Sequence, residues 1–193
     1  MTSSSGPRIR PLPPEEWDER LTKVLEAAPG GTEQPMHIFA TLARHPDLFR
    51  RWMGFGGALL YGKLPRRVCE LVILRTAYRF DGRYEWAQHV EMGANAGVSY
   101  DEMVALGGNL DAIDWDPIER AAVDAVDETH DLGAVTDSTW EMLSSAYDDA
   151  ELIELLMLIS HYLMLTFVLR SLRMEVEDRA EALADAVPGG PPF

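Results

Sequence analysis

The segment from Pro65 to Gly97 constrains the fold more strongly than any other part of the chain. Its first half contains the run VCELVIL at positions 68–74, which is apolar on every face of a helix except at Glu70. A helix that is apolar all round is usually enclosed by its neighbours. An enclosed carboxylate loses its hydration, so it must be paired, hydrogen-bonded or protonated. The run therefore predicts a buried helix that carries one acid into the protein interior.

The second half of this segment predicts another helix with ionisable groups on one face. Glu85 and His89 are four residues apart, which places them on the same side of a helix, with Tyr84 at its flank. Gly97 is a typical helix terminator. We therefore expect the acid of the first helix to meet the acid–imidazole pair of the second.

The rest of the sequence is typical of an all-α protein. No alternation of apolar and polar residues is long enough to predict a strand, and no repeat has solenoid spacing. We predict a single irregular helical bundle over residues 15–178, with a flexible N-terminal segment at 1–14 and an acidic, then Gly/Pro-rich tail at 179–193. Other helices are predicted at 14–28, 36–44, 48–61, 99–106 and 151–177, with helix starts at Asp116-Pro117, Thr136 and Asp148 or Asp149.

The helix at 151–177 is apolar on nearly every side along its middle. A chain of 193 residues seldom buries that much apolar surface by itself. Part of this helix is therefore predicted to lie in a subunit interface, and the protein is predicted to be a homo-oligomer.

The charge distribution argues against a nucleic-acid partner. The formal net charge is −15, which repels phosphates. Residues 44–83 are an exception, because they carry nine basic and three acidic side chains, a net charge of +6 (9 minus 3). These basic residues either form salt bridges with acidic helices or attract an anionic substrate, for which Arg75 and Arg79 are the candidates.

The sequence also gives expectations about the compartment. Cys69 is the single cysteine, so an intrachain disulfide is impossible and a reducing compartment, the cytoplasm, is expected. The first residues lack the apolar core of a signal peptide. We expect no apolar run of the roughly 18 to 20 residues that a membrane span requires, and hence no membrane partner.

The candidate site residues each have a structural alternative. Glu70 either is neutralised by an arginine, such as Arg66 one turn earlier, or relays a proton to His89. His89 is a candidate catalytic or substrate-binding residue. Glu85 either belongs to the site or stabilises the start of its helix. Tyr84 either donates to a developing oxyanion or fills space.

Other polar residues in the sequence are weaker candidates. Trp86 either lines the substrate site or packs in the core. His161 lies in an apolar helix and is expected to be a core or interface residue, and Cys69 is expected to be a small buried hydrophobe. One imidazole with two acids is an incomplete ligand set, so no metal is predicted.

These residues resemble a known family. The text ELVILRTAYRFDGRYEWAQHVEMGANAGVSYDEM, together with ARHPDLFRRWMGFGGALLYGKLPRR before it, is similar to the carboxymuconolactone decarboxylase family, which includes alkyl hydroperoxide reductase D. Later segments extend the resemblance over about residues 36–175. It implies an all-α fold whose subunits assemble as dimers, trimers or hexamers.

The resemblance also bears on the chemistry. Reductase-type members carry a C-x-x-C pair seven and four residues before the histidine, where this chain has Gly82 and Glu85. Disulfide-reductase chemistry by that route is therefore excluded. Glu70, Tyr84 and His89 match the accompanying residues, which suits the decarboxylase branch, a lyase type that needs no cofactor.

The sequence leaves several functions open. We predict a cofactor-independent enzyme that transfers a proton, with or without decarboxylation, on a small carboxylated lactone or carbonyl compound. His89, Glu70, Glu85 and Tyr84 are its predicted catalytic residues. The alternatives are a non-catalytic helical oligomer that binds a small ligand or a protein, and, less favoured, a redox protein acting through Cys69.

Overall fold

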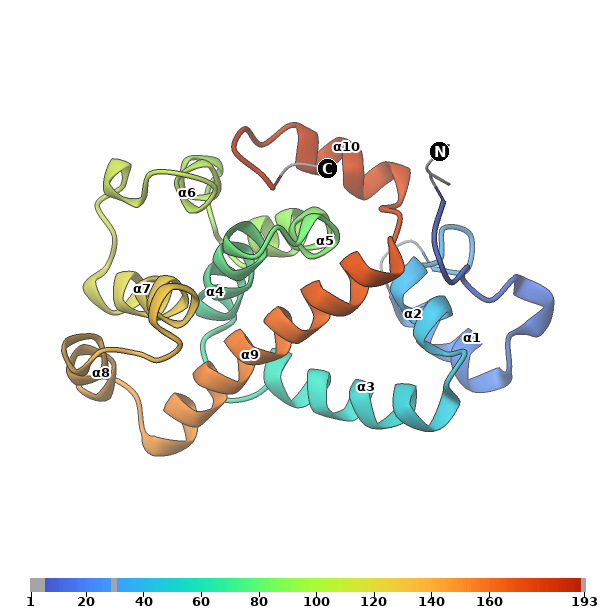
Figure 1. Ribbon diagram of the computed structural model, residues 1–193, viewed down its shortest axis with the longest axis horizontal. Coiled ribbons are helices and arrows are strands. Elements are labelled where there is room, and N and C mark those ends of the chain that lie inside the picture. The colour runs from blue at the N-terminus through green and yellow to red at the C-terminus, as the bar shows by residue number, and fades with distance from the viewer. Residues whose placement is uncertain (1–5, 29–30, 192–193) are drawn as a thin grey trace.

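The structure, a computed structural model, describes residues 6–28 and 31–191. Over these ranges it is all-helical, without a strand, as predicted. Figure 1 shows the long helix α9 crossing the molecule between a group formed by α4–α8 and another formed by α1–α3. The helices are α1 (Glu19–Ala27), α2 (His37–Leu42), α3 (Pro46–Leu60), α4 (Arg66–Arg79), α5 (Arg83–Asn95), α6 (Tyr100–Leu106), α7 (Pro117–Leu132), α8 (Asp137–Ser144), α9 (Asp149–Leu172) and α10 (Asp178–Asp185), with short 3₁₀ helices at Pro14–Glu16 and Leu110–Ala112.

Helix α4 is the buried centre of the fold. Every residue of the run Val68–Ala77 is buried, including Glu70, which has no exposed surface. Helices α5, α7 and α9 pack around α4, so each of its faces meets a neighbour. The predicted enclosure of this helix is confirmed, and it explains how the chain carries a carboxylate into its interior.

Several predicted helix starts are confirmed by their caps. Ser99 and Glu102 form a reciprocal capping box at α6. Asp116 caps α7, with Pro117 in the first turn. Thr136 caps α8, and Asp148 caps α9. Each of these signals lies within one turn of the residue it caps, so it can be recognised in the sequence alone.

The ends of the bundle differ from the predictions. The expected helix at 14–28 is divided into a 3₁₀ turn and α1, because Asp18 caps a new helix. Within the N-terminal segment expected to be flexible, Arg8 N donates to Leu172 O at 2.8 Å. Residues 1–5, 29–30 and 192–193 lie outside the described residues, so part of the expected N-terminal segment, loop and tail does too.

The C-terminal region also differs from the prediction. Helix α9 ends at Leu172, where Arg173 adopts a left-handed conformation with φ 54°, rather than at residue 177. The acidic part of the expected tail forms α10, which packs on α5.

Helix α9 corrects the expectation that no apolar run reaches the length of a membrane span. Among the described residues, α9 is a helix that is long enough and apolar enough to cross a membrane, judged by its length and composition alone. Half of its apolar window is buried against the rest of the protein, with Leu155 and Leu158 fully buried. A core helix of a soluble protein has the same character.

Candidate functional site

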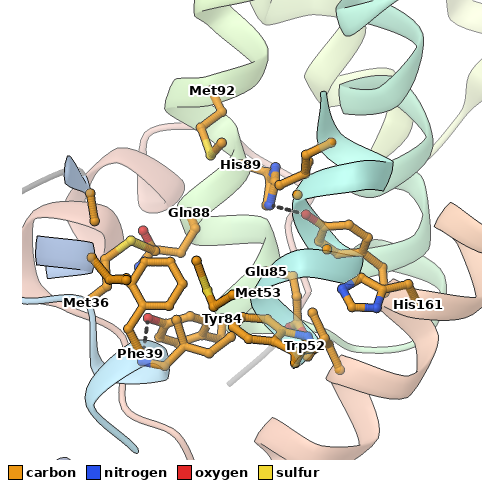
Figure 2. A pocket seen from close by; sticks show the side chains of 18 of the residues that line it. Met36, Phe39, Trp52, Met53, Tyr84, Glu85, Gln88, His89, Met92 and His161 are labelled. Atoms are coloured by element: carbon orange, nitrogen blue, oxygen red, sulfur yellow. Dashed lines mark hydrogen bonds between the residues drawn. The ribbon is translucent and has the colours of Figure 1, made fainter. Parts of the chain in front are cut away.

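A chain of polar contacts begins at Glu70 in the middle of α4. Its Oε2 lies 2.7 Å from His89 Nδ1 on α5, so the predicted meeting of these side chains is confirmed. Its other oxygen, Oε1, lies 2.6 Å from the guanidinium of Arg66, one turn earlier. On the far side of the imidazole, His89 Nε2 lies 3.1 Å from the hydroxyl of Tyr162 on α9. Figure 2 shows this last contact as a dashed line.

The partners of His89 limit the directions that its hydrogen bonds can take. A carboxylate beside a guanidinium is an acceptor, so Nδ1 donates to Glu70. Burial, together with the negative charge of Glu70, raises the pKa of Tyr162 well above its ordinary value, so the phenol stays protonated. When the imidazole carries its proton on Nδ1 alone, Tyr162 donates to Nε2. We call this ordered chain of Arg66, Glu70, His89 and Tyr162 the relay.

Glu85 lies on α5, one turn before His89, and does not belong to the relay. Its side chain is 3% exposed, and its Oε1 is buried with no hydrogen-bond partner in the described protein. Burial raises the pKa of Glu85 to about 7, despite the opposing effects of its own backbone amide, the neighbouring Thr166 hydroxyl and the charges of His89 and Arg170. Near neutral pH this carboxyl exists in both protonation states.

A cavity of about 440 Å³ lies beside the relay. Helices α1, α2, α3, α5 and α9 supply its walls, which include Glu85, His89 and Tyr162. Figure 2 shows Glu85 and His89 on one wall, with the aromatic side chains of Phe39 and Trp52 nearby. This volume falls within the range typical of sites for small molecules.

The cavity holds a second histidine, His161 on α9, which its apolar sequence context predicted to be a core or interface residue. It is 4% exposed, and its Nδ1 has no hydrogen-bond partner in the described protein. Burial lowers its pKa to about 4, so the ring is neutral at physiological pH. Trp52 stacks on this ring at a centroid distance of 6.2 Å. Gly56 faces the same imidazole, because a Cβ there would lie 3.4 Å from Nε2.

Tyr84 lines the cavity, but its hydroxyl is already engaged. It donates to Glu177 Oε1 at 2.8 Å and accepts from Ile38 N at 3.2 Å. Glu177 also accepts from the His37 backbone amide and the Gln88 side chain. This residue, just before α10, therefore ties α2 to α5. The predicted role of Tyr84 as a donor to an oxyanion would require this network to open.

The arginines predicted to bind substrate lie elsewhere. Arg75 forms a bidentate ion pair with Asp127 at 2.7 and 2.6 Å, and Arg79 contacts Asp131 at 2.5 Å. Neither lines the cavity. They belong to intramolecular salt bridges, which were the alternative interpretation of the basic segment. Those bridges also include Arg67, which pairs with acids on α6 and α7.

Two further predicted residues are core residues. Trp86 has no exposed surface and packs in the apolar cluster of α4, α5 and α6, away from the cavity lining. Cys69 is 1% exposed, and burial raises the pKa of its thiol to about 11, which makes it a poor nucleophile. No group of three or more His, Cys, Asp or Glu side chains in the described residues is arranged to hold a metal ion.

Some residues of the site could not be assigned to it from the sequence. Tyr162 and Trp52 stand out there only as members of apolar helices, and Glu177 only as the end of a helix. A tyrosine next to His161, and a histidine in the middle of so apolar a helix, are the signals that point to α9. Nothing local to Glu177 indicates that it contacts α2 and α5.

Three solved structures share this fold. A variant of the debrominase Bmp8, in complex with 2,3,4-tribromopyrrole, has a TM-score of 0.80 at 16% identity over 96% of this chain and 100% of its own. An alkylhydroperoxidase AhpD core, a peroxidase-related protein from Ralstonia eutropha JMP134, has a TM-score of 0.75 at 19% identity over 91% and 96%. A peroxidase-related protein from Silicibacter sp. TM1040 has a TM-score of 0.75 at 13% identity over 90% and 91%. At these identities the likeness concerns the fold alone.

The sequence comparisons are more specific. No curated protein sequence gives a significant match. Residues 46–128 match the profile of the carboxymuconolactone decarboxylase family, and this range contains α4, α5, Glu70, Glu85 and His89. Residues 46–128 are therefore similar to the carboxymuconolactone decarboxylase family, and the single cysteine of the chain rules out a C-x-x-C pair.

Proposed function

We propose that this protein is a cofactor-independent enzyme that moves a proton on a small carbonyl compound bound in the cavity. The observation that carries the proposal is the buried Glu85 carboxyl, whose Oε1 is unpartnered and whose pKa is about 7. A general acid–base group works best when its pKa lies near the operating pH. Perturbed carboxyl groups in a cavity are typical of catalytic sites.

The proposed reaction uses Glu85 as the base and then as the acid. Its carboxylate takes a proton from a carbon next to a carbonyl group, and the electron pair of that C–H bond moves toward the carbonyl oxygen. The protonated Glu85 returns the proton to the same carbon or to a conjugated one. Atoms and electrons balance, so the step requires no oxidant or reductant.

The relay supports the charge that develops during this reaction. Tyr162 lines the cavity, and His89 holds its hydroxyl at 3.1 Å. As negative charge develops on the carbonyl oxygen, the Tyr162 hydroxyl can turn toward it and donate. Glu70 keeps the imidazole in a fixed orientation at 2.7 Å. In this proposal Glu85 and Tyr162 touch the substrate, whereas His89 and Glu70 position Tyr162.

Decarboxylation is the finer form of this proposal, suggested by the family match over residues 46–128. It would require a cation to hold the carboxylate of the substrate. The described residues that line the cavity include no arginine, and their lysine, Lys23, is paired with Glu19. Proton transfer is therefore the part of the family chemistry that this site supports best. We place the enzyme in the cytoplasm, on the basis of its single buried cysteine.

Deuterium incorporation tests this function on a panel of compounds rather than on one chosen substrate. Unsaturated lactones and ketones, each with and without a carboxylate, are incubated with the protein in D₂O. Proton NMR follows C–H exchange, and released CO₂ reports decarboxylation. We expect the native protein to catalyse exchange in at least one compound, and Glu85→Gln to slow it at least about 100-fold.

The matched control for this experiment is Glu141→Gln, which changes an exposed carboxylate on α8 and should leave the rate unaltered. Exchange by Glu85→Gln at the native rate would remove Glu85 from the mechanism. Failure of the native protein to exchange any compound in the panel would contradict the proposed function.

The second candidate function is ligand binding without turnover. This function is favoured by the hydrogen bonds of His89, because both of its ring nitrogens already have protein partners. Glu70→Gln distinguishes the two functions. A purely structural relay predicts changed thermal stability with unaltered ligand affinity, whereas the enzyme hypothesis predicts lost exchange in a protein that still folds and binds.

A further inference from the structure

We propose that the cavity selects an uncharged, largely apolar ring compound, anchored by hydrogen bonds to Trp52, Glu85 and His161. This inference rests on the proposed function and names the substrate class of that site. It differs from the anionic substrate expected from the sequence, because the arginines on which that expectation depended lie in ion pairs outside the cavity.

The anchors are buried polar atoms that belong to residues of the cavity wall and have no partner in the described protein. They are Trp52 Nε1, Glu85 Oε1 and His161 Nδ1, all buried atoms of residues that line the cavity. A buried polar atom without a hydrogen bond destabilises the folded protein. A ligand that satisfies these atoms offsets part of that destabilisation, and one that cannot is disfavoured.

The anchors also specify complementary groups on the ligand. The indole N–H of Trp52 only donates, so it requires an acceptor such as a carbonyl or hydroxyl oxygen. The neutral His161 can accept through Nδ1 when its proton is on Nε2, and an ionised Glu85 also accepts. A molecule with an oxygen acceptor and one N–H or O–H donor therefore matches this wall.

The charges around the cavity disfavour an anion. Glu85 becomes negative as the pH rises through about 7, and His161 is neutral because burial lowers its pKa to about 4. The basic side chain among the described lining residues is Lys23 on α1, whose exposed ammonium contacts Glu19 at 2.7 Å. The guanidinium of Arg66 is paired with Glu70. A carboxylate inside the cavity would lose its hydration without gaining a cation.

The remaining wall is apolar and polarizable. Aromatic rings of Phe39 and Trp52 face the cavity together with the thioethers of Met36, Met53 and Met92 (Figure 2). Flexible methionine side chains adapt to the outline of a ligand, and their sulfur atoms contact aromatic rings favourably. Burial of a ring against this surface supplies affinity, while the anchors supply orientation.

A pair of probes of similar size and shape tests the inference. 2-Naphthol is uncharged at neutral pH and carries a donor and an acceptor on one ring, whereas 2-naphthoate is an anion of similar shape. Isothermal titration calorimetry on the full-length native protein should show that 2-naphthol binds at least about tenfold more tightly. Trp52→Phe keeps an aromatic six-membered ring but removes the pyrrole ring that carries the N–H, and should weaken 2-naphthol binding about fivefold.

The control for Trp52→Phe is Trp140→Phe, which makes the same change on the exposed surface of α8 and should leave affinity unaltered. Equal or tighter binding of 2-naphthoate, binding of neither probe, or an unaltered affinity in Trp52→Phe would overturn the inference. Selective 2-naphthol binding by a protein that exchanges no compound in D₂O would count against the proposed function alone. Exchange confined to carboxylated compounds would count against this inference alone.

Discussion

Glu85 and His161 lie in the walls of one cavity, and burial shifts their pKa values in opposite directions. The pKa of Glu85 rises from 4.5 to about 7, and that of His161 falls from 6.5 to about 4. Both groups are uncharged between pH 4.5 and 6.5 in the folded protein, although both are charged there in the unfolded chain. Burial thus removes charge from both groups without pairing them.

The shift of Glu85 predicts a measurable dependence of stability on pH. Between pH 4.5 and 7 the folded state holds a proton on Glu85 that the unfolded state has released, so the free energy of unfolding falls as pH rises. The variant Glu85→Gln has no carboxyl to titrate at this position, so its free energy of unfolding does not fall for this reason. Its stability relative to the native protein should increase by up to about 3 kcal/mol across that window. Urea unfolding at several pH values measures the difference.

Two further observations complete that experiment. His161 acts with the opposite sign, because its lowered pKa contributes stability that is present above pH 6.5 and is lost as the pH falls toward 4. It is present in both proteins, so it cancels in the comparison. A constant stability difference between native protein and variant from pH 4.5 to 7 would show that Glu85 titrates at its ordinary pKa.

Only some contacts of the relay could be predicted from sequence. Glu70 and His89 are 19 residues apart on consecutive helices. The apolar run around Glu70 predicted that its side chain is buried, where it can meet the next helix. Tyr162 is 73 residues from His89, and its position depends on the register of α9 against α5. Tertiary packing decides that register, so no local sequence pattern predicts the contact between Tyr162 and His89.

At the scale of elements, the turn between α4 and α5 brings their ionisable faces together. Asp81 adopts a left-handed conformation there, with φ 58°. The next residue, Gly82, donates its N–H to Ala77 O at 2.7 Å. A Cβ at Gly82 would lie 2.7 Å from Thr166 Oγ1 and 2.9 Å from Glu85 Oε2. The turn is therefore close enough to Glu85 and α9 that only glycine fits without displacement.

Gly82→Ala should consequently destabilise the fold, because the added methyl group must displace Thr166 or Glu85. Overpacking of this kind costs about 1 to 3 kcal/mol. Gly54→Ala is the matched control, since Gly54 lies within α3 and a Cβ there meets nothing within 4 Å. That change should stabilise the protein by about 1 kcal/mol. Thermal unfolding of both variants measures the contrast, and equal shifts in Tm would contradict the tight turn.

The helices differ in how well they could be predicted from their own sequence. Helix starts at Ser99, Asp116 and Thr136 could be predicted because a capping side chain acts within its own turn. Helix α10 could not, since its residues are acidic and followed by Gly and Pro, and packing on α5 stabilises it. Local propensity alone does not decide such a segment.

At the scale of the whole molecule, α9 leaves part of its apolar surface uncovered. Ile153 is 63% exposed and Phe167 57%, and Met157, Met164 and Val168 are also exposed. Apolar patches of this kind are typical of protein interfaces. We therefore propose that α9 joins copies of this chain, as the sequence predicted.

This proposal predicts a change of mass in a charged variant. We expect the native protein to be a dimer, trimer or hexamer by light scattering, and the double variant Ile153→Asp, Phe167→Asp to be a monomer with unaltered helical content. Tyr100→Asp is the control, because it changes an aromatic residue that is 54% exposed at the start of α6. A monomeric native protein would remove α9 as an interface between copies.

Arg66 gives the relay a closed end. Its guanidinium contacts Glu70 at 2.6 Å on the side away from His89. A guanidinium already carries all its protons and accepts none, so a proton cannot pass from Glu70 through Arg66 to bulk solvent. A proton that enters this path from the cavity must leave by the cavity. Exchange of a transferred proton with solvent, which the D₂O experiment measures, must then occur on the cavity side of the relay.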